Sequence, residues 1–140
     1  MLINGPNLNL LGIREPKIYG YETLDEIMTF IKNSPEGFSH KFKFFQTNHE
    51  GKIIDILHEQ IKWANGILIN PGALTHYSYA IRDAISALGI PTVEVHLSNI
   101  KNREEFRKIS VIEPVCIKQI SGLGKNSYIE GIKVLNEINE

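Results

Sequence analysis

The chain has 140 residues, of which 42% are hydrophobic and 22% are charged, and this predicts one soluble globular domain with a substantial core. Its formal net charge of −1 gives no excess of positive charge to attract nucleic acid or a membrane, so neither is expected as a partner. No apolar run approaches the ~20 residues of a membrane span, and residues 1–3 are too short for a signal peptide. Cys116 is the only cysteine, which excludes an intrachain disulfide and fits a cytoplasmic location; we expect it to be a buried structural thiol.

An unusually long connection follows the first apolar residues. Residues 4–20 read NGPNLNLLGIREPKIYG and separate a short predicted strand from a helix that begins near Thr23. They fill about sixteen positions where a connection usually takes about two to six. Long ordered loops often carry function, and this one holds a fixed cation, Arg14, and a phenol, Tyr19. We predict a mobile lid that brings a reactive group to a substrate, with an ordinary surface loop as the alternative.

Helical and strand patterns alternate through the rest of the chain. Thr23 and Glu26 match a capping box, and Asn102 with Glu105 three residues later can cap a second, short helix. Further strands are expected at 41–48, 66–70, 92–97 and 115–120, and further helices at about 53–61, 76–88 and 127–139. Five strands in so short a chain predict an α/β domain with a parallel sheet, wound like flavodoxin in three layers.

Polar residues follow four of the five predicted strands: Asn4, Asn48-His49, Asn70 and residues 96–98. The carboxyl ends of parallel strands meet at one edge of the sheet, which is where ligands bind in such folds. The 4–20 segment leaves from the same edge. We therefore expect one small crevice there, lined by these polar residues and covered by the lid.

Motifs for common cofactors and metals are missing. Residues 122–126 (GLGKN) lack the first glycine and the final Ser or Thr of a phosphate-binding loop, and a turn before the last helix is the better interpretation. The histidines are scattered and have no partner cysteines, so no metal site is expected. Nor is there a Gly-x-Ser-x-Gly nucleophile motif. We expect a phenol, a histidine, amides and arginines to perform the chemistry without a cofactor.

Five stretches carry a family resemblance: NGPNLNLLGIREPKIYG at 4–20, QTNHEGKIIDILHE at 46–59, INPGALTHYSYAIRDAI at 69–85, VEVHLSNIKNREEFR at 93–107, and the GLG…SY…GI pattern from 122. On these stretches the chain closely resembles the type II 3-dehydroquinate dehydratases, lyases that convert 3-dehydroquinate to 3-dehydroshikimate in aromatic amino-acid biosynthesis. The resemblance covers nearly all of the chain. It implies a flavodoxin-like fold, a single catalytic domain over residues 1–140, and a dodecamer built from trimers. One departure is that only three residues precede Asn4, where a longer first strand is expected.

The resemblance also implies the roles of five residues near the reacting atoms. Tyr19 would be the base that takes the proton beside the ketone. Arg14 would favour its phenolate, because a free phenol with a pKa near ~10 is almost wholly protonated at pH 7. Asn7 would support the enolate through an ordered water, and His96 would be the acid for the departing hydroxyl. Glu94, two residues earlier on the same strand face, would orient or charge the imidazole.

Substrate binding is implied for a further set: Asn70, His76, Leu97, Ser98 and Arg107. Leu97 and Ser98 would act chiefly through backbone N–H groups, which suit an anion. Arg107 would hydrogen-bond a ring hydroxyl. Asp83, on its face an exposed helix charge, would reach into the site of a neighbouring subunit.

Two other classes of protein remain as alternatives. A flavodoxin-like binding or signalling domain would leave unexplained why Arg14, Tyr19, Glu94 and His96 meet at one edge. A flavin or nucleotide carrier is disfavoured because no phosphate-binding loop is present.

Overall fold

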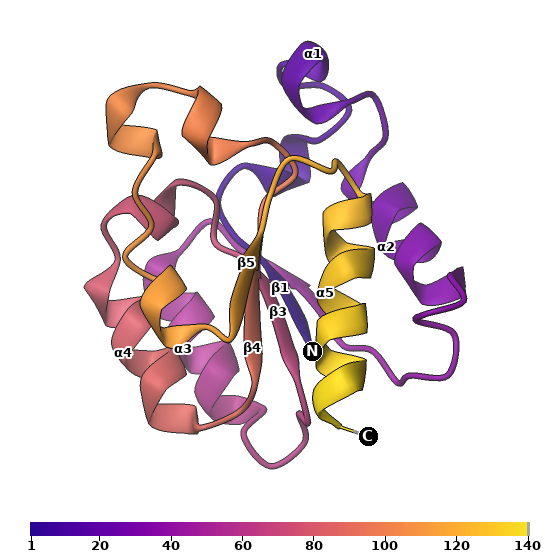
Figure 1. The fold of residues 1–140 in the computed structure, drawn as a ribbon, viewed down its shortest axis with the longest axis vertical. Helices are drawn as coiled ribbons and strands as arrows, with labels where there is room; N and C mark the ends of the chain where they lie inside the picture. The colour runs from indigo at the N-terminus through magenta and orange to yellow at the C-terminus, as the bar shows by residue number, and fades with distance from the viewer. Residues whose placement is uncertain (140) are drawn as a thin grey trace.

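The computed structural model describes residues 1–139, apart from the side chains of Ile18 and Tyr19 (Figure 1). Five strands form one sheet in the order β2-β1-β3-β4-β5, and every neighbouring pair is parallel. The strands are β1 (Leu2–Asn4), β2 (Phe44–Gln46), β3 (Ile67–Asn70), β4 (Thr92–Val95) and β5 (Lys118–Ile120). This order is the flavodoxin-like winding, so the predicted fold class is confirmed.

Helices cover both faces of the sheet and make the two outer layers (Figure 1). One face carries α2 (Leu24–Asn33) and α5 (Asn126–Ile138), and the other carries α3 (Glu50–Glu59) and α4 (Tyr79–Leu88). The central strands are buried on both sides, so successive side chains enter different cores. Leu68 packs in the cluster with α2 and α5, whereas Ile67 and Ile69 pack in the cluster with α3 and α4. No helix within residues 1–139 has the length and apolar character to span a membrane.

Local sequence signals set some element ends correctly and miss others. Thr23 caps α2 as predicted, because its Oγ1 accepts a hydrogen bond from the Glu26 N–H at 3.2 Å. The predicted cap at Asn102 is wrong. Asn102 ends the 3-10 helix η3 (Ile100–Asn102), which is capped by Asn99, and the next, η4 (Glu105–Arg107), follows Glu104. Two separate 3-10 turns form here in place of one short helix.

Strands and helices are also shorter than their apolar patterns. The strand expected at 41–48 pairs only over Phe44–Gln46, and the strand expected at 115–120 pairs only over Lys118–Ile120. Ile61 lies beyond the end of α3 and is 46% exposed, although it continues the helical stripe. Cys116 is half-buried, and burial raises the pKa of its thiol to about 12, which leaves it protonated and unreactive near neutral pH.

The 4–20 segment contains two short helices. The 3-10 helix η1 (Leu8–Leu10) lies next to the core, where Leu8 and Leu11 pack in the cluster with α2 and α5. The second, α1 (Pro16–Tyr19), stands above the carboxyl edge of the sheet (Figure 1). The segment is therefore anchored at its start and raised at its end, and the expectation that it moves stays a prediction.

Gly5 marks the point where the 4–20 segment crosses the end of β3. Its N–H donates to the Asn70 carbonyl at 2.7 Å, and a Cβ at this position would lie 2.6 Å from the Pro71 carbonyl oxygen. That contact is with backbone, which cannot turn aside as a side chain can. Close packing at Gly5 thus brings the first loop against the turn after β3.

We predict that Gly5→Ala lowers the free energy of unfolding by about 1–3 kcal/mol, because the two backbones must separate. Gly51→Ala is the matched control: Gly51 lies in α3, no atom stands within 4 Å of its Cβ position, and alanine is the better helix former. Urea denaturation of both variants measures the difference. Equal stability of the two variants would contradict the close approach.

Candidate active site

A cavity of about 140 Å³ opens at the carboxyl edge of the sheet, between the loops that follow β1, β3 and β4. Eight of the predicted site residues line it: Asn7, Arg14, Asn70, His76, His96, Leu97, Ser98 and Arg107. Three separate segments, after β1, at and after β3, and after β4, supply them, so only the folded chain brings them together. A larger cavity of about 290 Å³ lies at the opposite edge of the sheet, beside Trp63 and Leu135, but the described residues that line it include none of the predicted site residues and no carboxylate side chain.

Cationic side chains dominate the lining of this cavity. Arg14, Arg103 and Arg107 line it together with the two histidines, and no Asp or Glu is among the described residues of the lining. The Arg107 Nε donates to Glu104 at 2.7 Å, and its Cζ lies over the Phe106 ring, 4.6 Å from the ring centre, so two contacts hold the guanidinium. Guanidinium groups bind carboxylates through paired hydrogen bonds. The cavity therefore suits a small anion.

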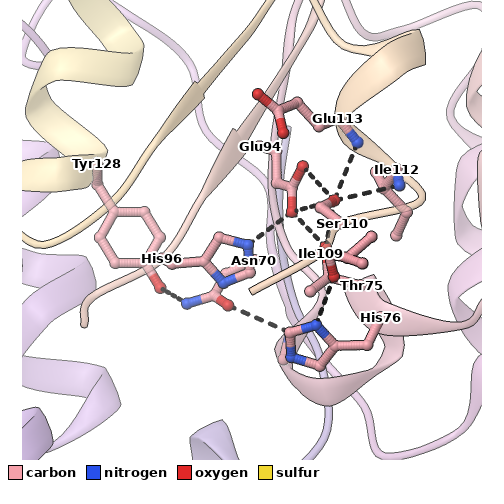
Figure 2. Close-up of polar contacts among 11 residues, drawn as sticks. Asn70, Thr75, His76, Glu94, His96, Ile109, Ser110, Ile112, Glu113 and Tyr128 are labelled. Carbon is pink, nitrogen blue, oxygen red and sulfur yellow. Dashed lines mark hydrogen bonds and ion pairs between the residues drawn. The ribbon is translucent and has the colours of Figure 1, made fainter. Parts of the chain in front are cut away.

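His96 is held from behind by a buried carboxylate (Figure 2). Glu94 is 0% exposed, and its Oε1 lies 2.6 Å from the His96 Nε2. Thr75 and Ser110 also hydrogen-bond the Glu94 carboxylate. Burial by itself would raise the pKa of Glu94, but the hydrogen bonds from these three residues and the charge of His96 outweigh it and lower the pKa. An ionised Glu94 accepts from His96 Nε2–H, so Nδ1 is the ring nitrogen left for a ligand.

The ring of His76 is fixed in a similar way. Its Nδ1 lies 2.7 Å from the Ile109 carbonyl oxygen, which can only accept, so Nδ1 carries the hydrogen (Figure 2). Partial burial and the nearby charges of His96 and Arg107 lower the pKa of His76, although the Ile109 carbonyl and Glu94 act in the opposite direction. A neutral His76 presents Nε2 as a hydrogen-bond acceptor, which suits a hydroxyl group.

Asn70 is oriented by a buried phenol. Its Nδ2 donates to the Tyr128 hydroxyl at 3.1 Å, and its Oδ1 accepts from the Gly72 N–H at 3.2 Å. The Tyr128 hydroxyl in turn donates to the Asn4 Oδ1 at 2.6 Å. Burial raises the pKa of Tyr128, so this phenol stays neutral and acts as a support.

Two of the four polar strand ends do not line the cavity. Asn4 is 1% exposed and its side chain points to Tyr128, because a buried amide needs partners that the core must supply. Asn48 is exposed, and its Oδ1 accepts from the Asn7 N–H at 3.0 Å and from the Gln46 side chain at 3.1 Å. Asn48 thus braces the backbone of Asn7. The expectation that all four strand ends converge on the crevice is wrong for these two.

Tyr19 and Asp83 are not among the described residues that line the cavity. The Tyr19 side chain lies outside the described part of the chain, so its place relative to the cavity stays a prediction. Asp83 is exposed on α4 and does not line the cavity. Among residues 1–139, no group of three or more His, Cys, Asp or Glu side chains could hold a metal ion.

Sequence reasoning missed four residues that shape the site: Thr75, Arg103, Ser110 and Tyr128. Three of them lie inside stretches that carried the family resemblance, but a threonine, a loop arginine or a helical tyrosine has no distinctive spacing. Ser110 lies outside those stretches. Thr75 and Ser110 are revealed by their contacts with Glu94, Tyr128 by its contact with Asn70, and Arg103 by its place in the lining of the cavity.

Fold and cavity together define an α/β protein with a cationic small-molecule site at the carboxyl edge of a parallel sheet. The family model for class II dehydroquinases matches residues 1–136, and the chain belongs to this family. A 3-dehydroquinate dehydratase of Caldicellulosiruptor saccharolyticus is 55% identical over 99% of this chain and 96% of its own. One from Bacillus subtilis is 51% identical over 96% of this chain and 91% of its own.

Solved structures agree with these relatives. The crystal structure of type II dehydroquinase from Butyrivibrio crossotus superposes with a TM-score of 0.93 at 51% identity, covering 96% of this chain and 94% of that one. The type II dehydroquinase from Propionibacterium acnes gives a TM-score of 0.91 at 37% identity, covering 97% and 94%.

We predict that Tyr128→Phe destabilises the protein and weakens ligand binding together. Loss of the hydroxyl leaves the buried Asn4 Oδ1 and Asn70 Nδ2 without this partner, at a cost of about 1–3 kcal/mol for each group. The free energy of unfolding should fall, and KM should rise because Asn70 loses its orientation. Tyr21→Phe, at a 78% exposed tyrosine, is the control and should change neither quantity. Unchanged stability and KM in Tyr128→Phe would show that Asn70 does not depend on the phenol.

Proposed function

We propose that the protein is a hydro-lyase that removes water from 3-dehydroquinate to give 3-dehydroshikimate, in the biosynthesis of aromatic amino acids. The observation that carries this proposal is the cationic cavity backed by the Glu94–His96 pair, in a chain that matches its family over residues 1–136. The relatives at 51–55% identity carry the name of this activity. We propose further that residues 1–140 form a single catalytic domain that acts in the cytoplasm.

Substrate binding follows from the lining of the cavity. 3-Dehydroquinate is a small polyhydroxylated carboxylate, and the backbone N–H groups of Leu97 and Ser98 would hold its carboxylate near the arginines. His76 Nε2 would accept from one ring hydroxyl, and Asn70 and Arg107 would bind others. Because Asn70 and His76 are each fixed by a second hydrogen bond, the substrate would be oriented with little further loss of side-chain freedom.

The reaction would begin with removal of the proton beside the ketone. Tyr19 as phenolate would take this proton, and the electron pair would move onto the ketone oxygen to form an enolate. Arg14 would lower the pKa of the phenol, since a neighbouring cation stabilises the phenolate. Asn7, whose N–H is braced by Asn48, would stabilise the enolate oxygen through a bound water.

Collapse of the enolate would then expel the hydroxyl group on the neighbouring carbon. His96 would donate a proton to this group, so that it leaves as water and the ring carbons form the conjugated double bond. Glu94 would stabilise the protonated imidazole before transfer and hold the ring in place. Transfer of the proton from Tyr19 back to His96 through water would restore both residues. Every step uses side chains of the protein, and no cofactor or metal enters it.

Assembly would complete the site. Asp83 is exposed on α4, outside the cavity, and aromatic side chains beside it and along the rim of the cavity are exposed as well: Tyr77 at 62%, Tyr79 at 62% and Phe106 at 61%. Exposed apolar side chains that gather in one region indicate a protein interface. We propose that a second copy of the chain covers this region, that Asp83 reaches the neighbour's site, and that trimers assemble into a dodecamer.

The activity is tested by following the absorbance of the conjugated enone product after adding 3-dehydroquinate, with and without excess chelator. We expect full activity in both cases, and His96→Asn should lower kcat by about 10²–10⁴-fold because the general acid is lost. Borohydride added with substrate should leave the enzyme active, because no lysine adduct forms in an enolate mechanism. An inactive protein, or one that is active only with added metal, would overturn the proposal.

Shared sites are tested by complementation. Arg14→Ala and Asp83→Ala should each be nearly inactive alone, because each removes one half of a shared site. After the two are mixed, unfolded and refolded together, about a quarter of the sites in random trimers combine an intact Arg14 with a neighbour's Asp83, and activity should return. Arg14→Ala refolded with Arg14→Lys is the control, since both lack the same residue. A fully active monomer by light scattering would refute the shared site.

A further inference from the structure

The carboxylate of Glu94, in β4, lies in a polar cluster whose four members come from three parts of the chain (Figure 2). His96 follows β4, Thr75 lies in the 3-10 helix η2 (Gly72–His76), and Ser110 precedes η5 (Glu113–Val115). Thr75 is 0% exposed and Ser110 is 9% exposed. The side chains of both residues contact Glu94, and neither residue lines the cavity.

The numbers of hydrogens and lone pairs on the Ser110 and Thr75 hydroxyls determine which groups donate in this cluster. The Ser110 Oγ accepts from the N–H groups of Ile112 at 3.2 Å and Glu113 at 3.0 Å, which occupies both of its lone pairs. Its single hydrogen must therefore be donated, and its possible acceptors are the two Glu94 carboxylate oxygens, each 2.9 Å away, and the Thr75 Oγ1, 2.8 Å away. The ionised carboxylate is the stronger acceptor of the two groups. Since Ser110 has no lone pair left for Thr75, the Thr75 hydroxyl donates to Glu94 Oε1. Both hydroxyls thus point their hydrogens at the carboxylate.

This arrangement suits the ionised form of Glu94, which can accept from both hydroxyls and from the His96 Nε2–H. A protonated carboxyl would itself be a donor, and His96 Nε2 could accept from it only in the tautomer that carries the ring hydrogen on Nδ1. Protonating Glu94 would therefore remove the hydrogen bond from the His96 Nε2–H and weaken those from the two hydroxyls, because a neutral carboxyl is a poorer acceptor than a carboxylate.

Backbone hydrogen bonds hold the two hydroxyls in place. The segment 109–113, which we call the strap, runs alongside η2, and the Val111 N–H donates to the Thr75 carbonyl at 2.8 Å. The Arg82 Nη1 of α4 reaches the Val111 carbonyl at 3.4 Å. The same strap provides the Ile109 carbonyl that fixes the His76 ring. A single segment thus supports Glu94 on one side and His76 on the other.

We propose that Thr75 and Ser110 are positioning residues that keep Glu94 ionised and aimed at His96, and that they act on this candidate acid from outside the cavity. Neither residue would touch the substrate. This inference rests on the proposed function for its effect on turnover, but its effect on the Glu94 proton is a property of the free protein.

Other titrating groups near Glu94 are few among the described residues. His96 and His76 face it from the β4 and η2 sides. Cys116, which follows η5, interacts electrostatically with both Glu94 and Glu113, and burial keeps its thiol protonated. Arg82, from α4, contacts the strap and remains charged. A shift in the acid limb of the pH–activity profile can therefore be assigned to Glu94 once the NMR signals of His76 and His96 are followed separately across the same pH range.

The test compares Thr75→Val, which keeps the shape and removes the hydroxyl, with Thr75→Ser, which keeps the hydroxyl. Infrared difference spectra of the free protein across a pH titration report the C=O band of a protonated Glu94, assigned by its absence in Glu94→Gln. In Thr75→Val and in Ser110→Ala this band should appear at a pH higher by about one unit or more, since a hydrogen bond to an ionised group is worth about tenfold or more. If Glu94 must be ionised for activity, raising its pKa moves the acid limb of the pH profile of kcat/KM to higher pH by the same amount.

Thr75→Ser should restore the wild-type band and pH profile. Thr92→Val is the control for loss of a buried hydroxyl, because Thr92 is 2% exposed and its Oγ1 donates to the Ile90 carbonyl at 2.9 Å; it should lower stability without moving the band. An unchanged band in Thr75→Val and Ser110→Ala would overturn the proposal, and if Thr75→Val does not fold, Ser110→Ala decides alone. A shifted band in a protein without dehydratase activity would leave the inference intact and refute the proposed function.

Discussion

The active edge of this protein depends on burying one negative charge. Glu94 is enclosed in the core, where an isolated carboxylate would take up a proton, and it is kept ionised by hydrogen bonds from His96, Thr75 and Ser110. Each donor is then committed to one orientation, because turning away would leave a buried group without a partner. The His96 ring, η2 and the strap each supply one of these donors, so the charge of Glu94 ties all three together.

The charge of Glu94 is separated from the cations of the cavity by the His96 ring. Behind the ring lies a carboxylate with hydroxyl donors, and in front of it lie the three arginines that line the cavity. A substrate carboxylate would therefore meet positive charge, while the imidazole would receive its negative partner from the core side. Placing Glu94 in the cavity itself would repel an anionic ligand, so the two charges need this layered arrangement.

A second buried hydrogen-bond network links the site to the helix layer formed by α2 and α5. Tyr128 of α5 reaches across the sheet face to bond Asn4 at the end of β1 and Asn70 at the end of β3. Its ring belongs to the core cluster with α2, and its hydroxyl orients a residue that lines the cavity. The Tyr128 side chain thus contributes both to the packing of the core and to the geometry of the site. We therefore expect a change at this position to affect both stability and binding.

The sequence by itself determined the fold class, most element positions and the identity of most cavity residues. Apolar periodicity and the Thr23 cap are local signals, and five alternations in a short chain leave few windings, so β3, α4 and β4 lie close to their predicted positions. The motif stretches around Asn70, His76 and His96 are likewise local signals: each is contiguous in the sequence, and so each could carry the family resemblance. The polar residues at the strand ends predicted the cavity lining less well, because the sequence pattern does not show which of them hydrogen-bond to other protein groups instead.

Tertiary structure alone decided how the site is supported. Asn4 turns from the cavity to Tyr128, which is 124 residues away in the chain, and Glu94 finds Ser110 at a separation of 16 and Thr75 at 19. Arg103 enters the lining and Asp83 stays outside it because of how the loops cross the sheet edge. The physical reason is that a buried polar group must be satisfied by whatever donors the fold brings near it, and those donors have no fixed spacing in the sequence.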